Sequence, residues 1–290
     1  MTITLDRPVV DELSHAVQVL RDWQHDGAPM QLHPGDLGWF WRFGAEATAA
    51  AVRTWSRDGR ILAVGLLDGP ALLRLTMVPD ARRDEELARR LVGDVAEPER
   101  GVLAPGTADI EAPAGALVDD LLSEAGWIAG ESWTPLRRDL TEPMTAPDAR
   151  IEVIGPDLAH VRAAVQRASF DGSTFTDGRW HAMAAGVPYA EARCLVAYGD
   201  QGDAVATATV WSAGAGRPGL VEPMGVHREH RGRGYGTAIT VAAAAALQEL
   251  GSSSAVVATP SAMAGAVATY ESAGFRRLPE VRDRHRPDSH

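Results

Sequence analysis

The sequence contains no lysine, since all 28 of its lysine and arginine positions are arginine. It has a single cysteine, Cys194, which excludes an intrachain disulfide framework and a metal site built from several cysteines. No run of about 18 uncharged apolar residues occurs, so we expect no membrane-spanning segment. The first ten residues lack the basic and then apolar layout of a signal peptide. These absences predict a soluble, cytoplasmic protein with no bound metal.

Acidic side chains outnumber basic ones, 39 to 28, and most of the excess lies in the first half of the chain. Residues 1–150 hold 25 acidic and 15 arginine side chains, a net charge of −10, whereas residues 151–290 hold 14 and 13, a net charge of −1. A nucleic-acid-binding protein would carry a basic surface, and neither half does. We therefore expect neither nucleic acid nor a membrane as a partner. An acidic surface favours cationic partners.

The order of the expected helices and strands is mixed and does not follow a regular strand–helix alternation. This order predicts an α+β fold with helices against a mixed, largely antiparallel sheet. A length of 290 residues is typical of two domains. Residues 141–150 are rich in proline and alanine and predict a linker. We expect one domain over 1–140 and a second over 151–290.

The two halves share two landmarks at one offset. Residues 73–78 (LRLTMV) resemble 221–226 (VEPMGV), and residues 123–127 (SEAGW) resemble 271–275 (ESAGF). Both pairs lie 148 residues apart, because 226 minus 78 and 274 minus 126 both equal 148. A common offset over two separate landmarks indicates an internal repeat.

The most informative segment joins a strand to a long helix and reads Arg-Gly-Arg-Gly-Tyr-Gly over 231–236. Alternate glycines let backbone N–H groups approach a ligand, and the start of a helix favours an anion such as pyrophosphate. A Walker A loop needs a lysine, which the chain lacks, and a dinucleotide fingerprint needs a different glycine spacing. The segment instead resembles the Arg-Gly-x-Gly-x-Gly pyrophosphate loop of acetyl-CoA enzymes. The alternative is a glycine-rich turn that only caps the helix.

Residues 220–275 resemble the GNAT superfamily of N-acetyltransferases. The resemblance covers the strand, glycine loop and Ala-rich helix over 220–250, and then residues 255–275, which end in Tyr-Glu-Ser-Ala-Gly-Phe. It implies two tandem GNAT (acyl-CoA N-acyltransferase) folds, with acetyl-CoA as the acyl-donor substrate. The residues that the resemblance assigns to acetyl-CoA are Met224, Gly225, Val226, Arg231, Gly232, Arg233, Gly234, Tyr235 and Gly236.

The resemblance also implies two catalytic residues, Tyr270 and Glu222. Tyr270 stands where GNAT enzymes often carry the general acid, and a phenol with a pKa of ~10 keeps its proton at neutral pH. Glu222 stands near a glutamate that accepts the amine proton in many members, and a carboxylate there could instead bind the amine. An asparagine of the family pattern is replaced by Met263, for which Ser261 or Thr259 could substitute.

The implied function is transfer of an acetyl group to a primary amine, with a small molecule as acceptor, by direct attack in a ternary complex. The alternative is a non-catalytic tandem GNAT-fold protein that binds or senses CoA. We expect a monomer or a homodimer. Three aromatic residues between the first helix and first strand of the second half form either the acceptor pocket or plain core, and they are Phe175, Trp180 and Tyr189.

The first half lacks this chemistry. At the offset of 148, Gly232 corresponds to Asp84 and Gly234 to Glu86, so two carboxylates replace the glycines of the loop. At ~4 Å and an effective dielectric constant of ~20, each would repel a phosphate by about 4 kcal/mol. The other two correspondences are Tyr270 with Leu122 and Glu222 with Arg74. The first half resembles the degenerate N-terminal domain of tandem GNAT proteins, an architecture like that of mycothiol synthase, and we expect it not to bind CoA.

Overall fold

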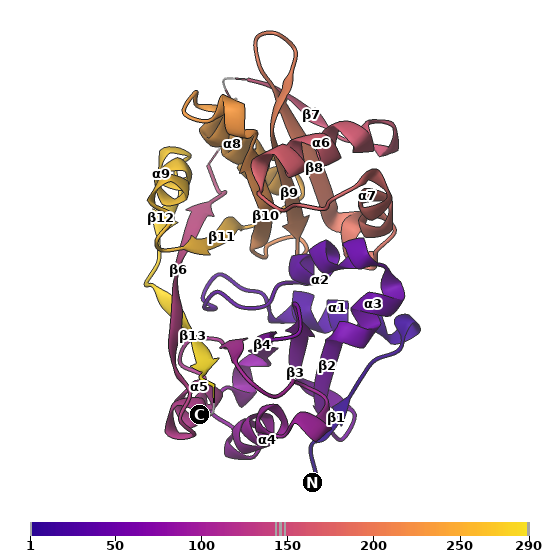
Figure 1. Cartoon of the computed structure of the whole chain (residues 1–290), viewed down its shortest axis with the longest axis vertical. Coiled ribbons are helices and arrows are strands. Elements are labelled where there is room, and N and C mark those ends of the chain that lie inside the picture. The colour runs from indigo at the N-terminus through magenta and orange to yellow at the C-terminus, as the bar shows by residue number, and fades with distance from the viewer. Residues whose placement is uncertain (1, 143, 145–146, 148, 289–290) are drawn as a thin grey trace.

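The computed structural model describes residues 2–142, 144, 147 and 149–288, and its two halves lie one above the other along the long axis (Figure 1). Of the predicted linker, residues 143, 145, 146 and 148 lie outside the described residues, and Arg150 begins a strand. The strands of the first half are β1 (Thr4–Asp6), β2 (Val52–Arg57), β3 (Arg60–Leu67), β4 (Leu72–Met77), β5 (Ala108–Glu111) and β6 (Ile128–Asp139). Its α-helices are α1 (Leu13–Trp23), α2 (Pro34–Phe40), α3 (Ala45–Ala51), α4 (Glu85–Ala96) and α5 (Leu117–Glu124).

The second half has a similar order of elements, with two α-helices instead of three before its second strand and an additional short strand, β12. Its strands are β7 (Arg150–Val153), β8 (Ala192–Tyr198), β9 (Ala204–Ser212), β10 (Gly219–Val226), β11 (Ser254–Pro260), β12 (Arg276–Arg277) and β13 (Val281–Arg286). Its α-helices are α6 (Ala159–Ser169), α7 (Asp177–Ala184), α8 (Tyr235–Glu249) and α9 (Ala264–Ser272).

All the described strands join one 13-stranded sheet that runs through both halves. Its order is β1-β2-β3-β4-β5-β13-β6-β11-β10-β9-β8-β7, with β12 paired to β6. Among the described strand pairs, β4–β5 and β10–β11 are parallel and the others are antiparallel. The predicted α+β fold with a mixed, largely antiparallel sheet is confirmed.

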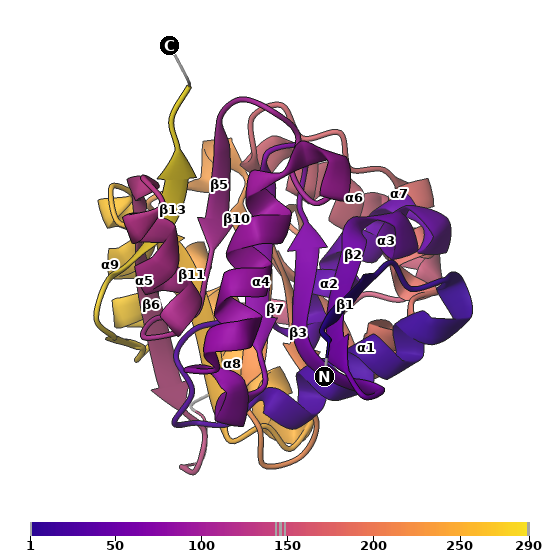
Figure 2. The same ribbon diagram turned by 90° about the horizontal axis from the view of Figure 1, so that it is seen from below.

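The two halves exchange their last strands. β6 belongs to the first half in sequence, yet it pairs with β11 of the second half from Trp133 to Asp139. β13 is the last strand of the chain, and it pairs with β5 of the first half. Figure 1 shows β6 running from one half to the other, with β13 beside its lower part, and Figure 2 shows β13 next to β5. Nothing in the hydrophobic pattern of the sequence indicated this exchange of strands. The division into domains 1–140 and 151–290, with a linker at 141–150, remains a prediction.

The second half packs helices on both faces of the sheet. Along β8, Leu195 and Ala197 lie in one core with α8, whereas Cys194 and Val196 lie in another with α6 and α7. Successive side chains of a strand point to opposite faces, which accounts for this alternation. Cys194 is therefore a buried core thiol. Within the described part of the chain, no helix is both long and apolar enough to cross a bilayer.

Helix α2 of the first half packs directly on Trp211 in β9 of the second half. A Cβ on Gly35 would lie 2.5 Å from the Trp211 Cβ. A Cβ on Gly38 would collide with the six-membered ring of the Trp211 indole. The indole Nε1 of Trp211 donates a hydrogen bond of 2.7 Å to the backbone oxygen of Glu222. The close approach of α2 therefore fixes the first half beside β10, where the predicted catalytic glutamate lies.

Candidate active site

Strands β10 and β11 pair only at their beginnings. The parallel ladder ends at Leu220, although β10 continues to Val226 and β11 to Pro260. On its other edge, β10 is interrupted by a bulge between Val221 and Met224, where Pro223 has no N–H to donate. A cavity of about 360 Å³ opens between the diverging strands. This volume is in the range of small-molecule sites.

Both halves supply walls of this cavity, which we call the catalytic cavity. The first half contributes Arg74 and Glu111, and the second half contributes Glu222 and Tyr270. The exchanged strand β13 contributes Asp283, whose carboxylate accepts a 3.0 Å hydrogen bond from the indole of Trp133. The cavity is therefore complete only when the two halves are together.

The glycine loop has the conformation that its sequence predicts. Gly232 and Gly234 have φ angles of 76° and 84°, the left-handed region that favours glycine. Helix α8 begins at Tyr235, and its first hydrogen bond runs from the Ala238 N–H to the Gly234 oxygen at 3.0 Å. The N–H groups that precede this bond have no acceptor within the helix. They form a site that suits a phosphate group.

The two arginines of the loop differ in their surroundings. A guanidinium nitrogen of Arg231 donates a hydrogen bond of 2.7 Å to the backbone oxygen of Ser169, which holds the loop against the end of α6. Arg233 is exposed. Arg231 therefore fixes the loop, while the side chain of Arg233 is accessible to a ligand from solvent.

The other residues assigned to acetyl-CoA lie between the cavity and the loop. Met224 lines the catalytic cavity, and Val226 is half-buried at the end of β10. Gly225 and Gly236 allow close packing. A Cβ on Gly225 would lie 2.7 Å from the Ser169 side chain, and one on Gly236 would lie 2.9 Å from Thr269 in α9. These two glycines have a packing reason independent of any ligand.

Glu222 and Tyr270, which are 48 positions apart, line the same cavity. The Tyr270 side chain comes from α9, is 5% exposed and packs against Phe275, with the ring centroids 5.9 Å apart. Burial raises the pKa of Tyr270 above its usual value, and the negative charge of Glu222 adds to this rise. Tyr270 is therefore a neutral phenol near physiological pH, with a proton available to donate.

Arg74 is the centre of a cluster of carboxylates at the first-half wall of the cavity. It donates from Nε to Glu111 at 2.7 Å, and its Nη1 lies 2.8 Å from the Asp36 carboxylate. The same nitrogen lies 3.8 Å from Glu222 and 4.0 Å from Asp68. One arginine thus faces four carboxyl groups, one of which is the predicted catalytic glutamate.

Asp36 is the most buried of these carboxyl groups. Burial raises its pKa well above the usual value, Arg74 opposes the rise, and the charge of Glu222 adds to it. Even without Asp36, the carboxyl groups of Asp68, Glu111 and Glu222 outnumber the two nearby guanidinium groups. These belong to Arg74 and to Arg42, whose charge acts on Asp68 and Glu222. The cluster keeps an excess of negative charge and favours a cationic ligand.

Residues 190–277 match the family described as acetyltransferase (GNAT) domain. The chain carries a GNAT domain. None of the curated proteins matches this sequence. The match contains β10, the glycine loop and Tyr270, so the family resemblance predicted from the sequence is confirmed.

Solved structures extend the likeness to nearly the whole chain. A GCN5-related N-acetyltransferase from Sphaerobacter thermophilus superposes with a TM-score of 0.61 at 20% identity, covering 98% of this chain and 95% of that one. A tandem GNAT protein from the clavulanic acid biosynthesis pathway gives 0.59 at 14% identity, covering 98% of both chains. A GNAT acetyltransferase from Colwellia psychrerythraea also gives 0.59, at 12% identity and the same coverage. At these identities the likeness shows the fold, and the tandem GNAT fold is confirmed.

The first half carries acids at the helix start that corresponds to the GNAT glycine loop. Asp84 is the N-cap of α4, as Gly234 is of α8, and its carboxylate accepts a 2.9 Å hydrogen bond from the Leu87 N–H. Arg57 pairs with Asp84 at 2.8 Å and with Glu86 at 2.9 Å. The helix start is thus capped by its own side chains. The two caps are 150 residues apart, so the structural register differs by two residues from the offset of 148.

The three aromatic residues assigned to the acceptor lie in the core between the halves. Phe175 stacks on Trp39 of the first half with 5.3 Å between ring centroids, and Trp180 and Tyr189 pack edge to face at 5.8 Å. None of the three lines the catalytic cavity as described. Their role in acceptor binding remains a prediction, while Phe170, from the same region, does line the cavity.

Sequence reasoning missed Arg74 and Asp283 as cavity residues, and Asp36 as the buried partner of Arg74. The sequence did contain a signal for Arg74, because the offset of 148 aligns Arg74 with Glu222. That alignment indicated only that the first half lacks the glutamate, and not that Arg74 lies in the site. For Asp283 no signal existed, since the strand exchange brings it to the site. Over the described residues, no group of three or more His, Cys, Asp or Glu side chains is arranged to hold a metal ion.

Proposed function

We propose that the protein is an acetyl-CoA-dependent N-acetyltransferase whose acceptor is a small primary amine. One observation carries the proposal: Glu222 and Tyr270 line a single cavity between the diverging strands β10 and β11 of a GNAT domain. A carboxylate that accepts a proton and a phenol that donates one are what aminolysis of a thioester needs.

The acyl donor in this proposal is acetyl-CoA, bound as a substrate along β10 and the glycine loop. The N–H groups at the start of α8 suit its pyrophosphate, with Arg233 beside them. The edge of β10 that faces β11 has no ladder partner beyond Leu220 and can hydrogen-bond an extended amide chain such as pantetheine. The first half, with Asp84 at its helix start, is proposed to bind no CoA.

The proposed reaction is a direct attack in the ternary complex. The amine nitrogen bonds to the thioester carbonyl carbon, and the C–S bond then breaks. The proton of the amine passes to Glu222, and the departing thiolate takes the phenolic proton of Tyr270. The products are an N-substituted acetamide and CoA.

The acceptor is proposed to be cationic and small. The carboxylates around Arg74 exceed it in charge and attract an ammonium group, which must lose a proton before it attacks. A cavity of about 360 Å³ holds a small molecule more readily than a folded protein segment. Contributions from both halves support an acceptor site at the domain boundary.

The test is to measure thiol release from acetyl-CoA with a panel of primary amines. Tyr270→Phe removes one oxygen and keeps the ring, so we expect kcat to fall by about 10²–10⁴ while the acetyl-CoA Kd stays within about twofold. Tyr198→Phe is the matched control, because Tyr198 lies on β8 against Arg150 and outside the catalytic cavity.

Two results would contradict the proposal. A wild-type rate in Tyr270→Phe would mean that another group donates the proton to the departing thiolate. Tight acetyl-CoA binding without thiol release for any amine would favour the non-catalytic, CoA-sensing alternative.

A further inference from the structure

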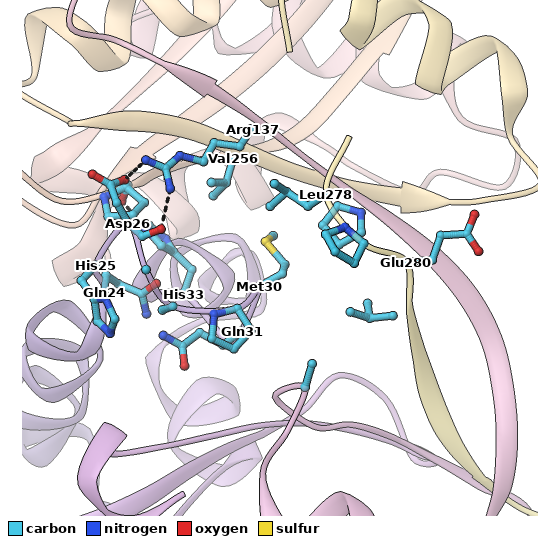
Figure 3. A pocket seen from close by; sticks show the side chains of 18 residues that line it. Gln24, His25, Asp26, Met30, Gln31, His33, Arg137, Val256, Leu278 and Glu280 are labelled. Atoms are coloured by element: carbon cyan, nitrogen blue, oxygen red, sulfur yellow. Dashed lines mark hydrogen bonds and ion pairs between the residues drawn. The ribbon is translucent and has the colours of Figure 1, made fainter. Parts of the chain in front are cut away.

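A second cavity of about 430 Å³ adjoins the catalytic cavity between the two halves (Figure 3). One side is the loop that follows α1 in the first half, and the other is built from β6, β11 and the segment that leads into β13. Met30 and Val281 line both cavities, so the two spaces meet at these side chains. We call this space the second cavity.

Six of the seven polar side chains in the wall of the second cavity already have partners within the protein. Arg137 pairs with Asp26 at 2.7 Å, drawn as dashed lines in Figure 3. Gln24 donates to the Leu20 and Leu32 carbonyls, both at 3.1 Å. Such groups gain little from a polar ligand, because their hydrogen bonds are already made.

Three further polar groups of this wall are engaged in the same way. Gln31 accepts a 2.8 Å hydrogen bond from Thr76, and Glu280 accepts one of 2.9 Å from Ser132. His33 is buried, and this burial lowers its pKa to about 4, so its ring is uncharged at neutral pH. It lies 3.1 Å from the Pro218 oxygen. The wall therefore offers no unpaired charge at these positions.

Apart from His25, the rest of the lining of the second cavity is apolar. Its lining includes Ala28, Pro29, Ala114, Val256, Leu278 and Pro279. An apolar wall with satisfied polar neighbours favours a hydrocarbon group, since each methylene removed from water contributes about 0.8 kcal/mol.

We propose that the acceptor amine carries an apolar group of several carbon atoms, which lies in the second cavity while the amine lies beside Glu222. This inference rests on the proposed acetyl transfer. The carboxylate cluster attracts the ammonium group to the first-half side of the catalytic cavity, and Met30, at the junction, comes from the same half. The acceptor is then an amphipathic amine with a cationic head and an apolar tail.

The test is a series of linear primary amines from ethylamine to octylamine at saturating acetyl-CoA. We expect kcat/KM to rise about fourfold per added methylene, as 0.8 kcal/mol implies, until the second cavity is filled. Ala114→Trp places a bulky ring in the second cavity from an exposed position. We expect it to abolish the rise for long amines and to leave ethylamine within about twofold of wild type. Ala50→Trp, at an exposed position in α3, is the control.

The outcomes separate this inference from the proposed function. Acetylation of all the amines with no dependence on length overturns the inference and leaves the acetyl transfer standing. A loss in Ala114→Trp that affects butyryl-CoA, but not long amines, would assign the second cavity to an acyl chain and also overturn it. No thiol release with any amine would overturn both proposals.

Discussion

Replacing Arg74 by methionine would remove a positive charge that faces four carboxyl groups at the boundary between the halves. The arginine side chain is 13% exposed, and its partner Asp36 is 1% exposed. Methionine keeps much of the length and the apolar stem but neither donates a hydrogen bond nor carries a charge. Removing one partner of a buried ion pair costs about 3–5 kcal/mol, because the other charge is left buried and unpaired. Natural domains have only about 5–15 kcal/mol of stability, so this loss is large.

The assay is unfolding in urea, monitored by tryptophan fluorescence, at pH 7 and at pH 4.5. We expect Arg74→Met to lower the free energy of unfolding by about 3–5 kcal/mol at pH 7. The loss should be smaller at pH 4.5, because burial raises the pKa of Asp36 and a protonated Asp36 needs no neighbouring cation. The free energy of unfolding of Arg74→Lys should lie between those of the wild type and Arg74→Met. Lysine keeps the charge, but its ammonium group cannot bond Asp36 and Glu111 at the same time as the forked guanidinium does.

The control for this prediction is Arg89→Met. Arg89 pairs with Glu85 at 2.9 Å on an exposed surface of α4, and such pairs contribute about 0.5 kcal/mol or less. If Arg74→Met destabilised the protein no more than Arg89→Met at pH 7, Arg74 would not be the compensating charge of the cluster. The argument for a cation-attracting site would then lose its basis.

Three other predictions concern ligand binding, pH and chain continuity. Gly234→Glu should abolish acetyl-CoA binding in calorimetry, whereas the wild type should bind one equivalent per chain, and two equivalent sites would contradict a degenerate first half. The pKa of His33 is lowered from 6.5 to about 4 in the folded protein, so the unfolded chain binds more protons between these values. Stability should thus fall by about 3 kcal/mol from pH 6.5 to pH 4, and His33→Asn should remove this loss while keeping a cap for α2. Cleavage at a protease site inserted within 141–149 should leave one species on gel filtration, because β6 and β13 each pair with the other half, and separation of the halves would contradict the exchange.

The glycine loop could be predicted because its causes are local. Gly232 and Gly234 adopt positive φ angles that other residues rarely adopt, and the alanine-rich stretch that follows forms α8 as expected. The repeat and the order of elements were also local patterns. Glu222 and Tyr270 came from the family resemblance, and the structure brings them to one cavity.

The rest of the cavity depends on contacts between distant segments, which no local pattern records. β6 is long for a strand, with 12 residues, but nothing in its sequence specifies whether its partner is β5 or β11. The partner is decided by which sheet edge is free, and that is a property of the assembled halves. Arg74 and Asp283 therefore could not be assigned to the site from the sequence.

The strand exchange also explains why the first half has an arginine, Arg74, where the second half has a glutamate, Glu222. Val281 pairs with Trp133 at the centre of the sheet, and these positions are themselves 148 residues apart. The two halves are thus related by an approximate two-fold axis, and corresponding residues near such an axis face each other. Arg74 and Glu222 are such a pair, with 3.8 Å between their charged atoms.

A glutamate in both copies would place two carboxylates against each other across that axis. Arginine at one of the two positions replaces this repulsion with attraction, so the divergence of the first copy stabilises the contact. Arg74→Glu should therefore destabilise the protein more than Arg74→Met does in the same urea assay at pH 7. The charge-exchanged double variant Arg74→Glu, Glu222→Arg should recover part of the stability. It should not recover acetyl transfer, because the proposed proton acceptor is no longer in the second half. Equal stability of Arg74→Glu and Arg74→Met would mean that the two positions do not interact across the axis.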